Sequence, residues 1–541
     1  MKGAVFQKII PTKGRHANAD YLRDIHVEHI NGNGGTKHYN QIVMDNTSAN
    51  VNSWTLIETY YKFMIICSGC KCHFLNLIYK DVVLDVYCAG GFQKLSDMVN
   101  WWNFRKCTFL PLLHTFMEQS YGQTYALLTY VATRWSSRGI MAKSAVRSKA
   151  ALMAAVSSDK WVTETSTRYL DREQRAAAAK TKSTVMDTGN WIRIELLLRF
   201  LEPITRLSTL MSTDIGEVLP MFWIGMWAIR KQWDSQPYSD DRAKGFEGVS
   251  HRFALRANKI LWEKWEKHEH SLDAAAALLH PYNHAKLSEL DPIYGHLKVG
   301  DVPSVEVLDS LKEGMDKFME TYVLDTNMRV KLRDQMQLFL DKDPGSFQND
   351  AFHPTTILRY KYEPSRWWKL YSRPPVRDLA MLAITRVLPC KGSSSSAERN
   401  FSTWGLILTK LRNRLLLSKA TMMVYIYQNL KTLRRERGDA LWLPDLVLND
   451  DDDGPGLQPT FDDEDTATWW DDFCEKNAEA AATLPMPEEE PDNPFTFESP
   501  PNSPHRAPPI SAERQREAAR RRLLDHDEDD RNFEAEMTTG A

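Results

Sequence analysis

Apolar spacing divides the chain into a short strand and helix part and a long helical part. Gly3–Ile10 has strand character, and Ala19–Ile30 has the spacing of a helix that the glycine-rich residues 31–35 end. Asn40–Met44 is predicted to be a short buried strand that leads into Asp45. This order of strand, helix and strand is typical of a sheet covered by helices.

From Ser53 onwards, apolar residues recur with a period near 3.6, which predicts a helical middle. The predicted helices are Trp54–Ile66, Leu110–Thr133, Lys143–Ser157, Trp191–Met211, Phe222–Trp233, His251–His268, Val305–Met315 and Met328–Leu340. Loops are expected at Ala176–Asn190, Ser235–Gly248 and Asp343–Pro354. Helical spacing resumes at Pro374–Leu388 and continues in pieces to Arg437.

The composition changes after Leu448. Four aspartates at 450–453 and the Pro- and Glu-rich residues 485–509 cannot bury enough apolar surface to offset the ordering of the chain. We therefore expect residues 449–541 to be disordered. Ala512–Leu524 suits a short exposed helix, and its Arg520–Arg522 run is either a solvated helix face or a basic targeting signal.

Charge and cysteine content narrow the class of protein. The 541 residues are 43% hydrophobic and 26% charged, and no apolar run approaches the roughly 18 residues of a membrane helix. A net charge of -3 gives no overall attraction to nucleic acid, although Lys410–Arg414 and Lys431–Arg437 are locally basic. Seven cysteines, three of them at 67, 70 and 72, do not form a disulfide framework, so we expect reduced thiols.

A serine-rich motif follows the last predicted apolar helix. Asp378–Ala383, Val387–Pro389, Ser393–Ser402, and then Lys410 with Arg412–Leu415 match in order the C-terminal region of hAT-superfamily DNA transposases, which this segment resembles. The resemblance implies that Glu398 is the third acid of the catalytic triad. The residues alone also permit a capping box, in which Ser395 and Glu398 satisfy amides at a helix start.

A second match surrounds Asp45. Tyr39–Asn50 resembles the hAT strand that ends in a catalytic aspartate. A carboxylate after a buried strand is presented at the carboxyl edge of a sheet, where ligands of open α/β sheets bind. The alternative is an Asx-type turn, in which Asp45 caps the helix that begins at Thr47.

Two further motifs carry candidate site residues. Cys67–Asp81 resembles a hAT segment in which Cys70 and His73 occupy the family's positions. The spacing of Cys70 and His73 would also suit a zinc site, but no second Cys/His pair lies nearby in the sequence. We therefore expect packed or hydrogen-bonded side chains and no zinc. Ala132–Arg138 resembles the "TRWNS" motif, with Ser136 in place of Asn.

In the family, the arginine and tryptophan of this motif lie near the active site. By resemblance Arg134 and Trp135 contact DNA, since guanidinium suits phosphate and indole suits base stacking, and Lys410, Arg412 and Arg414 are further DNA contacts. Trp135 could equally be a core residue. A weaker similarity spans Ala274–Tyr282, where His280 stands in place of the usual Asp.

The resemblance implies an α+β, mostly α fold: an incomplete ribonuclease-H-like α/β core interrupted by a large helical insertion, with a disordered tail. The expected parts are residues 1–135 as the N-terminal part of the core, 136–370 as the helical insertion, 371–437 as the C-terminal dimerisation and catalytic segment, and 438–541 as the acidic tail. Asp45 and Glu398 would hold Mg²⁺ or Mn²⁺, which prefer carboxylate oxygens.

One acid of the triad has no counterpart. In the family the first aspartate lies on a strand upstream of the one matched by Gly3–Lys8, so we expect the first acid to be missing and the chain not to cut DNA. Two hypotheses compete: a nuclear, transposase-derived enzyme acting on transposon ends, or a non-catalytic protein that dimerises or associates with DNA. A third is a purely helical scaffold in which the motifs are fortuitous. Ser418–Arg437 offers an apolar helix face for a homodimer or for the protein's own core.

Overall fold

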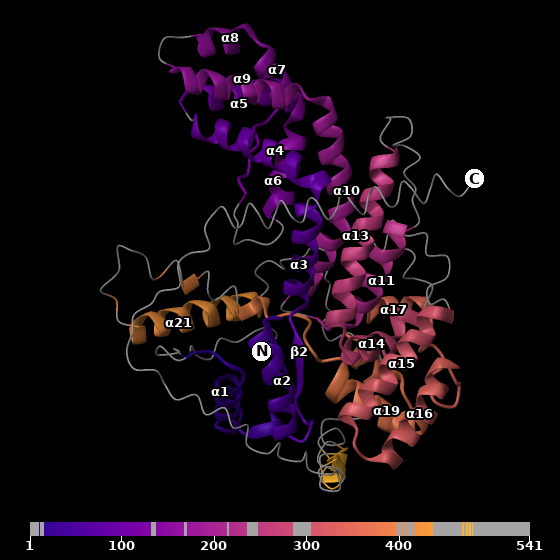
Figure 1. Cartoon of the computed structure of the whole chain (residues 1–541). Coiled ribbons are helices and arrows are strands. Elements are labelled where there is room, and N and C mark those ends of the chain that lie inside the picture. Colours follow the sequence, from indigo (N-terminus) through magenta and orange to yellow (C-terminus); the bar gives the residue numbers. More distant parts are fainter. Residues whose placement is uncertain are drawn as a thin grey trace, which may run out of the picture. The chain divides into compact units, whose positions relative to one another are not determined.

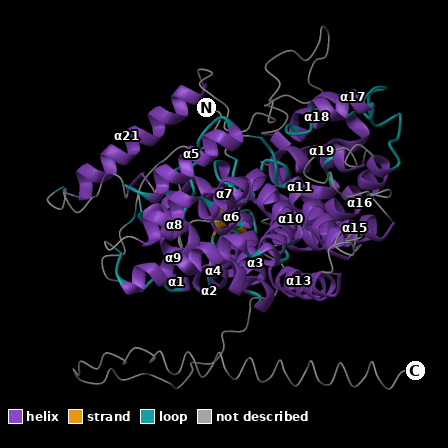
Figure 2. Cartoon of the chain, turned by 90° about the horizontal axis from the view of Figure 1, so that it is seen from above, coloured by secondary structure: helices purple, strands orange, loops and turns teal. Residues whose placement is uncertain are grey.

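The computed structural model describes residues 10, 16–105, 107–130, 137–166, 170–213, 216–234, 247–284, 305–397, 403–404, 407, 415, 417–436, 468–469, 472–473, 475–477 and 479. Helices make up most of this part of the chain (Figure 2), which confirms the mostly helical class. None of the described helices combines the length and hydrophobicity that crossing a membrane requires. The predicted strand Gly3–Ile10 lies outside the described residues except for Ile10.

Two short parallel strands form the sheet of the described residues. β1 (Gln41–Met44) is the strand predicted before Asp45, and α2 (Ser48–Tyr60) connects it to β2 (Ile66–Gly69). The helix predicted at Trp54–Ile66 is therefore wrong at both ends, since α2 starts earlier and Ile66 already belongs to a strand. β2 is buried throughout, so its sequence lacks the alternation of a half-exposed strand.

A strained turn before β2 is held from the C-terminal part of the chain. Lys62 and Phe63 adopt positive φ values of 50° and 60°, which are costly for residues other than glycine. The fully buried guanidinium of Arg386 donates to the carbonyls of Phe63 (2.9 Å) and Met64 and to Oδ1 of Asn40 (2.9 Å). Residues before both strands are thus fixed by one side chain.

The N-terminal helix agrees with its prediction. α1 (Ala19–Asn31) is capped by Asn18, whose side chain accepts from the amide of Tyr21 (3.0 Å). It packs against α2, and the chain then turns through the left-handed Gly34 into the 3₁₀ turn η1 (Gly35–Lys37).

Helices α3 to α10 follow β2 (Figure 1). They are α3 (Lys71–Leu84), α4 (Val86–Phe104), α5 (Phe109–Tyr121), α6 (Ser137–Arg147), α7 (Lys149–Ser157), α8 (Asp159–Ser166), α9 (Arg172–Met186) and α10 (Thr188–Met211). The helix predicted to reach Thr133 ends at Tyr121, where Gly122 is left-handed. The loop predicted at Ala176–Asn190 is wrong, because four alanines favour helix and only Asp187 separates α9 from α10.

A second helical group packs around aromatic side chains. Its members are α11 (Pro220–Asp234), α13 (Glu247–His268), α14 (Ser271–Leu278), η2 (Pro281–His284), α15 (Val305–Tyr322), α16 (Thr326–Leu340), α17 (Pro354–Arg359) and α18 (Pro364–Tyr371). Phe339, Phe347, Trp367 and Trp368 are fully buried in mutual contact. The loop predicted before Pro354 is confirmed, whereas most of the loop predicted at Ser235–Gly248 lies outside the described residues.

The chain then returns to the strands. η4 (Pro374–Val376), α19 (Arg377–Leu382) and the π-helical turn η5 (Ala383–Val387) realise the helical prediction for Pro374–Leu388, and η5 carries Arg386. α21 (Leu417–Glu436) follows. Thr468, Trp469 and the described residues up to 479 are helical, with Trp469 and Phe473 buried, so the disorder expected for this part of the tail does not hold.

Candidate functional site

The candidate site lies at the carboxyl ends of β1 and β2, and we call it the strand-edge site. The amide of Cys70 donates to the carbonyl of Met44 (2.6 Å), which extends the pairing one residue beyond β2 and sets Asp45 beside Cys70. Asn46 folds over Gly69 so closely that a Cβ there would lie 1.9 Å from the Asn46 amide oxygen. Glycine at position 69 therefore permits the turn that carries Asp45.

Asp45 is half-buried, and side chains at the start of α2 hold its carboxylate. Its Oδ1 accepts from the hydroxyl of Thr47 (3.1 Å) and from the amide of Asn50. Within the described residues, no hydrogen bond reaches Oδ2. The expected alternative, a carboxylate capping backbone amides of α2, is not the arrangement seen, because Asp45 binds two side chains and Thr47 is the N-cap residue. One carboxylate oxygen is thus available to a ligand.

The serine-rich segment Gly392–Ala397 lies against the same edge. The amide of Lys71 donates to the carbonyl of Gly392 (2.7 Å), and the amide of Ser394 donates to Sγ of Cys70 (3.4 Å). Ser395 donates through its hydroxyl to the carbonyl of Ser212 (3.1 Å) at the end of α10. The segment is therefore fixed both to β2 and to a helix of the middle part.

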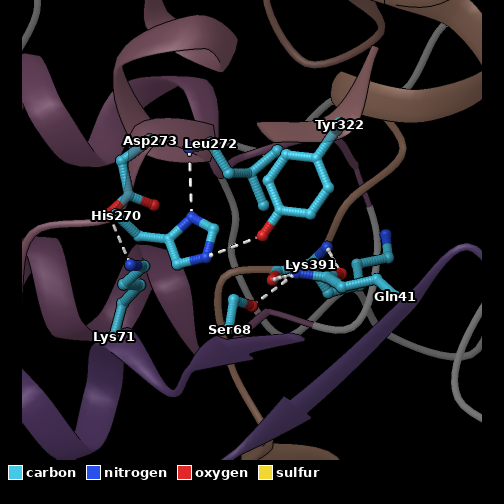
Figure 3. Close-up of polar contacts among 8 residues, drawn as sticks. All are labelled: Gln41, Ser68, Lys71, His270, Leu272, Asp273, Tyr322 and Lys391. Atoms are coloured by element: carbon cyan, nitrogen blue, oxygen red, sulfur yellow. Dashed lines mark hydrogen bonds and ion pairs between the residues drawn. The ribbon is translucent and has the colours of Figure 1, made fainter. Parts of the chain in front are cut away.

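Gln41 joins this segment to both strands (Figure 3). Its side chain exchanges two hydrogen bonds with the backbone of Lys391, 2.7 Å and 3.0 Å long, and donates to the Ser68 hydroxyl (2.8 Å). Ala397 is the last described residue of the segment. Glu398 itself lies outside the described residues, so whether its carboxylate meets that of Asp45 stays a prediction.

Cys70 and His73 open α3. Sγ of Cys70 accepts from the backbone amide of His73 (3.5 Å) as the N-cap of this helix. A hydrogen bond with Cys72, and to a smaller extent those from Ser394 and His73, lower the pKa of Cys70 to about 5 against the opposing effect of burial. Cys70 is thus a packed and hydrogen-bonded side chain, as the sequence predicts.

A buried ion pair lies next to the strand-edge site. Lys71 Nζ and Asp273 Oδ2 are 2.5 Å apart, and only 4% and 2% of these side chains are exposed (Figure 3). His270, the N-cap of α14, accepts from the amide of Leu272 (3.1 Å), and burial lowers its pKa to about 3, so it is neutral beside the lysine. Sequence reasoning missed this pair; its one signal is a single acid in the apolar run 272–279.

The remaining predicted site residues are not placed. Arg134, Trp135, Glu398, Lys410, Arg412 and Arg414 all lie outside the described residues. In the part of the chain that is described, no three His, Cys, Asp or Glu side chains gather as metal ligands. Asp45 alone at this edge does not make a Mg²⁺ or Mn²⁺ site, which needs several oxygen ligands.

Comparisons with known proteins add no family. No protein-family model matches the chain, and no curated protein matches it. The hAT resemblance therefore rests on the motifs of the sequence itself.

Proposed function

We propose that this chain derives from the catalytic region of a hAT-type DNA transposase and has lost the ancestral cleavage and transfer of DNA strands. The observation that supports this proposal is the meeting of two hAT-like motifs at the strand-edge site. The motif around Asp45 and the serine-rich segment are some 350 residues apart in sequence. The amide of Ser394 nevertheless donates to Sγ of Cys70, the residue beside Asp45. A catalytic core divided by an insertion requires this proximity of the two motifs, so the contact supports the proposed ancestry.

The proposed fold is the remainder of a ribonuclease-H-like core. The unit β1–α2–β2, with an acid after its first strand, would be part of that core, and the helices that separate it from residue 371 would contain the insertion. Phosphodiester cleavage by such cores uses at least three carboxylates around two divalent metals. Asp45 and Glu398 are the two acids that the motifs assign in this sequence. A site with these two acids alone is not expected to cleave DNA.

The test is DNA cleavage and binding by the full chain. Supercoiled plasmid with Mn²⁺ or Mg²⁺ should stay uncut by the wild type, as by Asp45→Asn and Glu398→Gln. A labelled duplex should bind, with affinity that falls as salt rises because lysine and arginine contact phosphates. Nicking by the wild type that vanishes in Asp45→Asn, but not in the matched surface variant Asp24→Asn, would disprove inactivity and strengthen the ancestry. Absence of both binding and cleavage would refute a DNA function.

A second candidate is a non-catalytic protein that forms homodimers through α21. Ala420 and Val424 are buried against Trp404, Ile407 and Leu415. Several large apolar side chains of the same helix are exposed, among them Met422 (64%), Ile426 (50%) and Leu430 (47%). Such a stripe is typical of a surface that a partner covers. Both candidates would act on or beside nuclear DNA.

A further inference from the structure

The described residues of segment 468–479, the gold helix in Figure 1, pack on the folded core with one helix face. Trp469, Phe473 and Asn477 follow each other at intervals of four, which places them on that face. They are 6%, 2% and 1% exposed, and the two aromatic rings stack with centroids 5.0 Å apart. Asp472, Glu475 and Glu479 are exposed on the outer side.

The polar contacts of this face are specific. The Asn477 side chain accepts from the amide of Leu324 (2.7 Å) and donates to the carbonyl of Tyr322 (3.0 Å). Tyr322 is the last residue of α15 and Leu324 follows just after it, so Asn477 caps the end of a helix that lies about 150 residues earlier in the chain. Trp469 donates its indole N–H to Oδ1 of Asp378 (3.1 Å).

The surface that receives the segment is held in place by its own bonds. Asp378 Oδ2 also accepts from Lys331 (2.7 Å) and Gln335 (3.0 Å), and Gln335 in turn accepts from the amide of Leu379 (2.8 Å). These contacts join α16 to α19 without any residue of the segment. We call the surface between the α15–α16 turn and α19, on which the segment packs, the groove; these bonds hold it in place.

The groove also connects to β2. The Tyr322 hydroxyl donates to Oε1 of Glu58 (2.7 Å), and the same oxygen accepts from the amide of Cys67 (2.8 Å) in β2. Asn477 therefore bonds to the residue that reaches the strand. Hydrogen bonds through Tyr322 and Glu58 thus connect the groove to β2, the strand that ends at the strand-edge site.

We infer that this groove is a peptide-binding surface and that its occupant is the chain's own Trp469–Asn477 segment, docked from the end of a 31-residue acidic tether, residues 437–467. The tether gives the segment a high effective concentration at the groove, so docking in cis outcompetes free peptide. Because the contacts are made by the three inward side chains, the same sequence supplied as a free peptide fits the same groove. The segment is a clasp that fastens α15, α16 and α19.

The experiment uses the full chain with Trp469→Ala and Phe473→Ala, which empties the groove, and a labelled peptide of residues 466–480. Fluorescence anisotropy should show binding to this variant and binding weaker by about tenfold or more to the wild type. A peptide with Asn477→Asp, which cannot donate to the Tyr322 carbonyl, should bind the variant about tenfold more weakly. A peptide with Glu475→Gln, changed on the outer side, should bind like the native one.

No peptide binding to a variant whose circular dichroism matches the wild type would overturn the inference, as would equal binding of the Asn477→Asp peptide. If the free peptide dissociates a wild-type dimer, the occupant belongs to a second copy and docking in cis is wrong. Should the double variant not fold, hydrogen exchange on full-length Asn477→Leu, which removes the oxygen that accepts from the Leu324 amide, gives the answer. The Leu324 amide should then exchange faster, and unchanged protection at Leu324 would refute the contact.

Discussion

At the scale of single residues, the buried Lys71–Asp273 ion pair should be sensitive to mutation. Both side chains are almost completely buried, and the ammonium of Lys71 also lies 5.0 Å from the ring centroid of Phe222. A buried charge is tolerated when its partner compensates for the lost hydration. Each charge of the pair is therefore stable in the core only while the other is present. The backbone of the same Lys71 bonds to Gly392 in the serine-rich segment.

Removing one member should cost far more than removing both. Asp273→Ala strands the ammonium of Lys71, and the free energy of unfolding should fall by about 3 to 5 kcal/mol. The double variant Lys71→Met with Asp273→Leu should regain most of that loss, because no uncompensated charge remains. Urea denaturation at pH 7 measures both values. A double variant as unstable as Asp273→Ala would show that the charges are not the cause.

His280 should make stability depend on pH. Its Nδ1 accepts from the amide of Tyr282 (3.1 Å) and its Nε2 donates to the carbonyl of Lys361 (2.9 Å), so the neutral ring satisfies both neighbours. Burial lowers its pKa from 6.5 to about 4. Between these values the unfolded chain binds the extra proton, so stability is complete above pH 6.5 and declines as pH falls towards 4.

The matched measurement compares the wild type with His280→Gln. Between pH 4 and 6.5 the slope of unfolding free energy against pH should be smaller in the variant by about 1.4 kcal/mol per pH unit, the contribution of one proton. His270 and His284, which burial also makes hard to protonate, are present in both proteins and cancel. Identical slopes would mean that His280 takes up its proton in the folded state.

Sequence alone locates a residue relative to its neighbours in the chain, but it does not predict contacts between distant residues. Asp45 could be placed after a strand because its neighbours in sequence form that strand. Lys71 and Asp273 could not be paired, since 202 residues separate them and neither spacing nor composition reports a contact at that distance. The same holds for Gln41 with Lys391 and for Arg386 with the turn at Phe63.

Among elements, α21 carries the clearest unpartnered face. If this face joins two copies, Ile426→Glu should weaken self-association without lowering the melting temperature, because the side chain is half exposed. Light scattering across a concentration series measures the mass. Lys419→Gln, changed at an exposed position of the same helix, is the control. A wild type that stays monomeric at every concentration would remove the dimer candidate.

The local pattern of apolar residues predicts most of the helices. It fails at three elements: β2, α9 and the Trp469–Asn477 segment. β2 is hard to find from sequence because its first residues continue the apolar run Phe63–Cys67, which looks like the end of the preceding helix. α9 was predicted as a loop although its alanines favour helix. The Trp469–Asn477 segment could not be anticipated, because its acidic surroundings dominate the composition and its three inward residues are matched only by a distant groove.

For the whole molecule, order along the chain and proximity in space are largely unrelated. The serine-rich segment, Arg386 and the clasp all return to the two strands after more than 300 residues of mostly helical chain. The proposed ancestry explains this return for the serine-rich segment, because a divided catalytic core must bring its acids together across an insertion. The account as a whole therefore depends on the positions of Asp45 and Glu398.

Cross-linking measures that proximity directly. Cysteines replace Asp45 and Glu398 in a chain whose Cys70, Cys88, Cys107 and Cys474 are serine, and a short bismaleimide is added. Cys70 is replaced because its thiol lies beside Asp45 and would compete for the linker. The account predicts efficient intramolecular cross-linking of this pair, and none for Asp45→Cys with Glu479→Cys, since segment 468–479 contacts the chain before β2, at the opposite end of the strand. Failure of the first pair to cross-link, with both cysteines reactive in the folded protein, would contradict a shared site and with it the transposase origin proposed here.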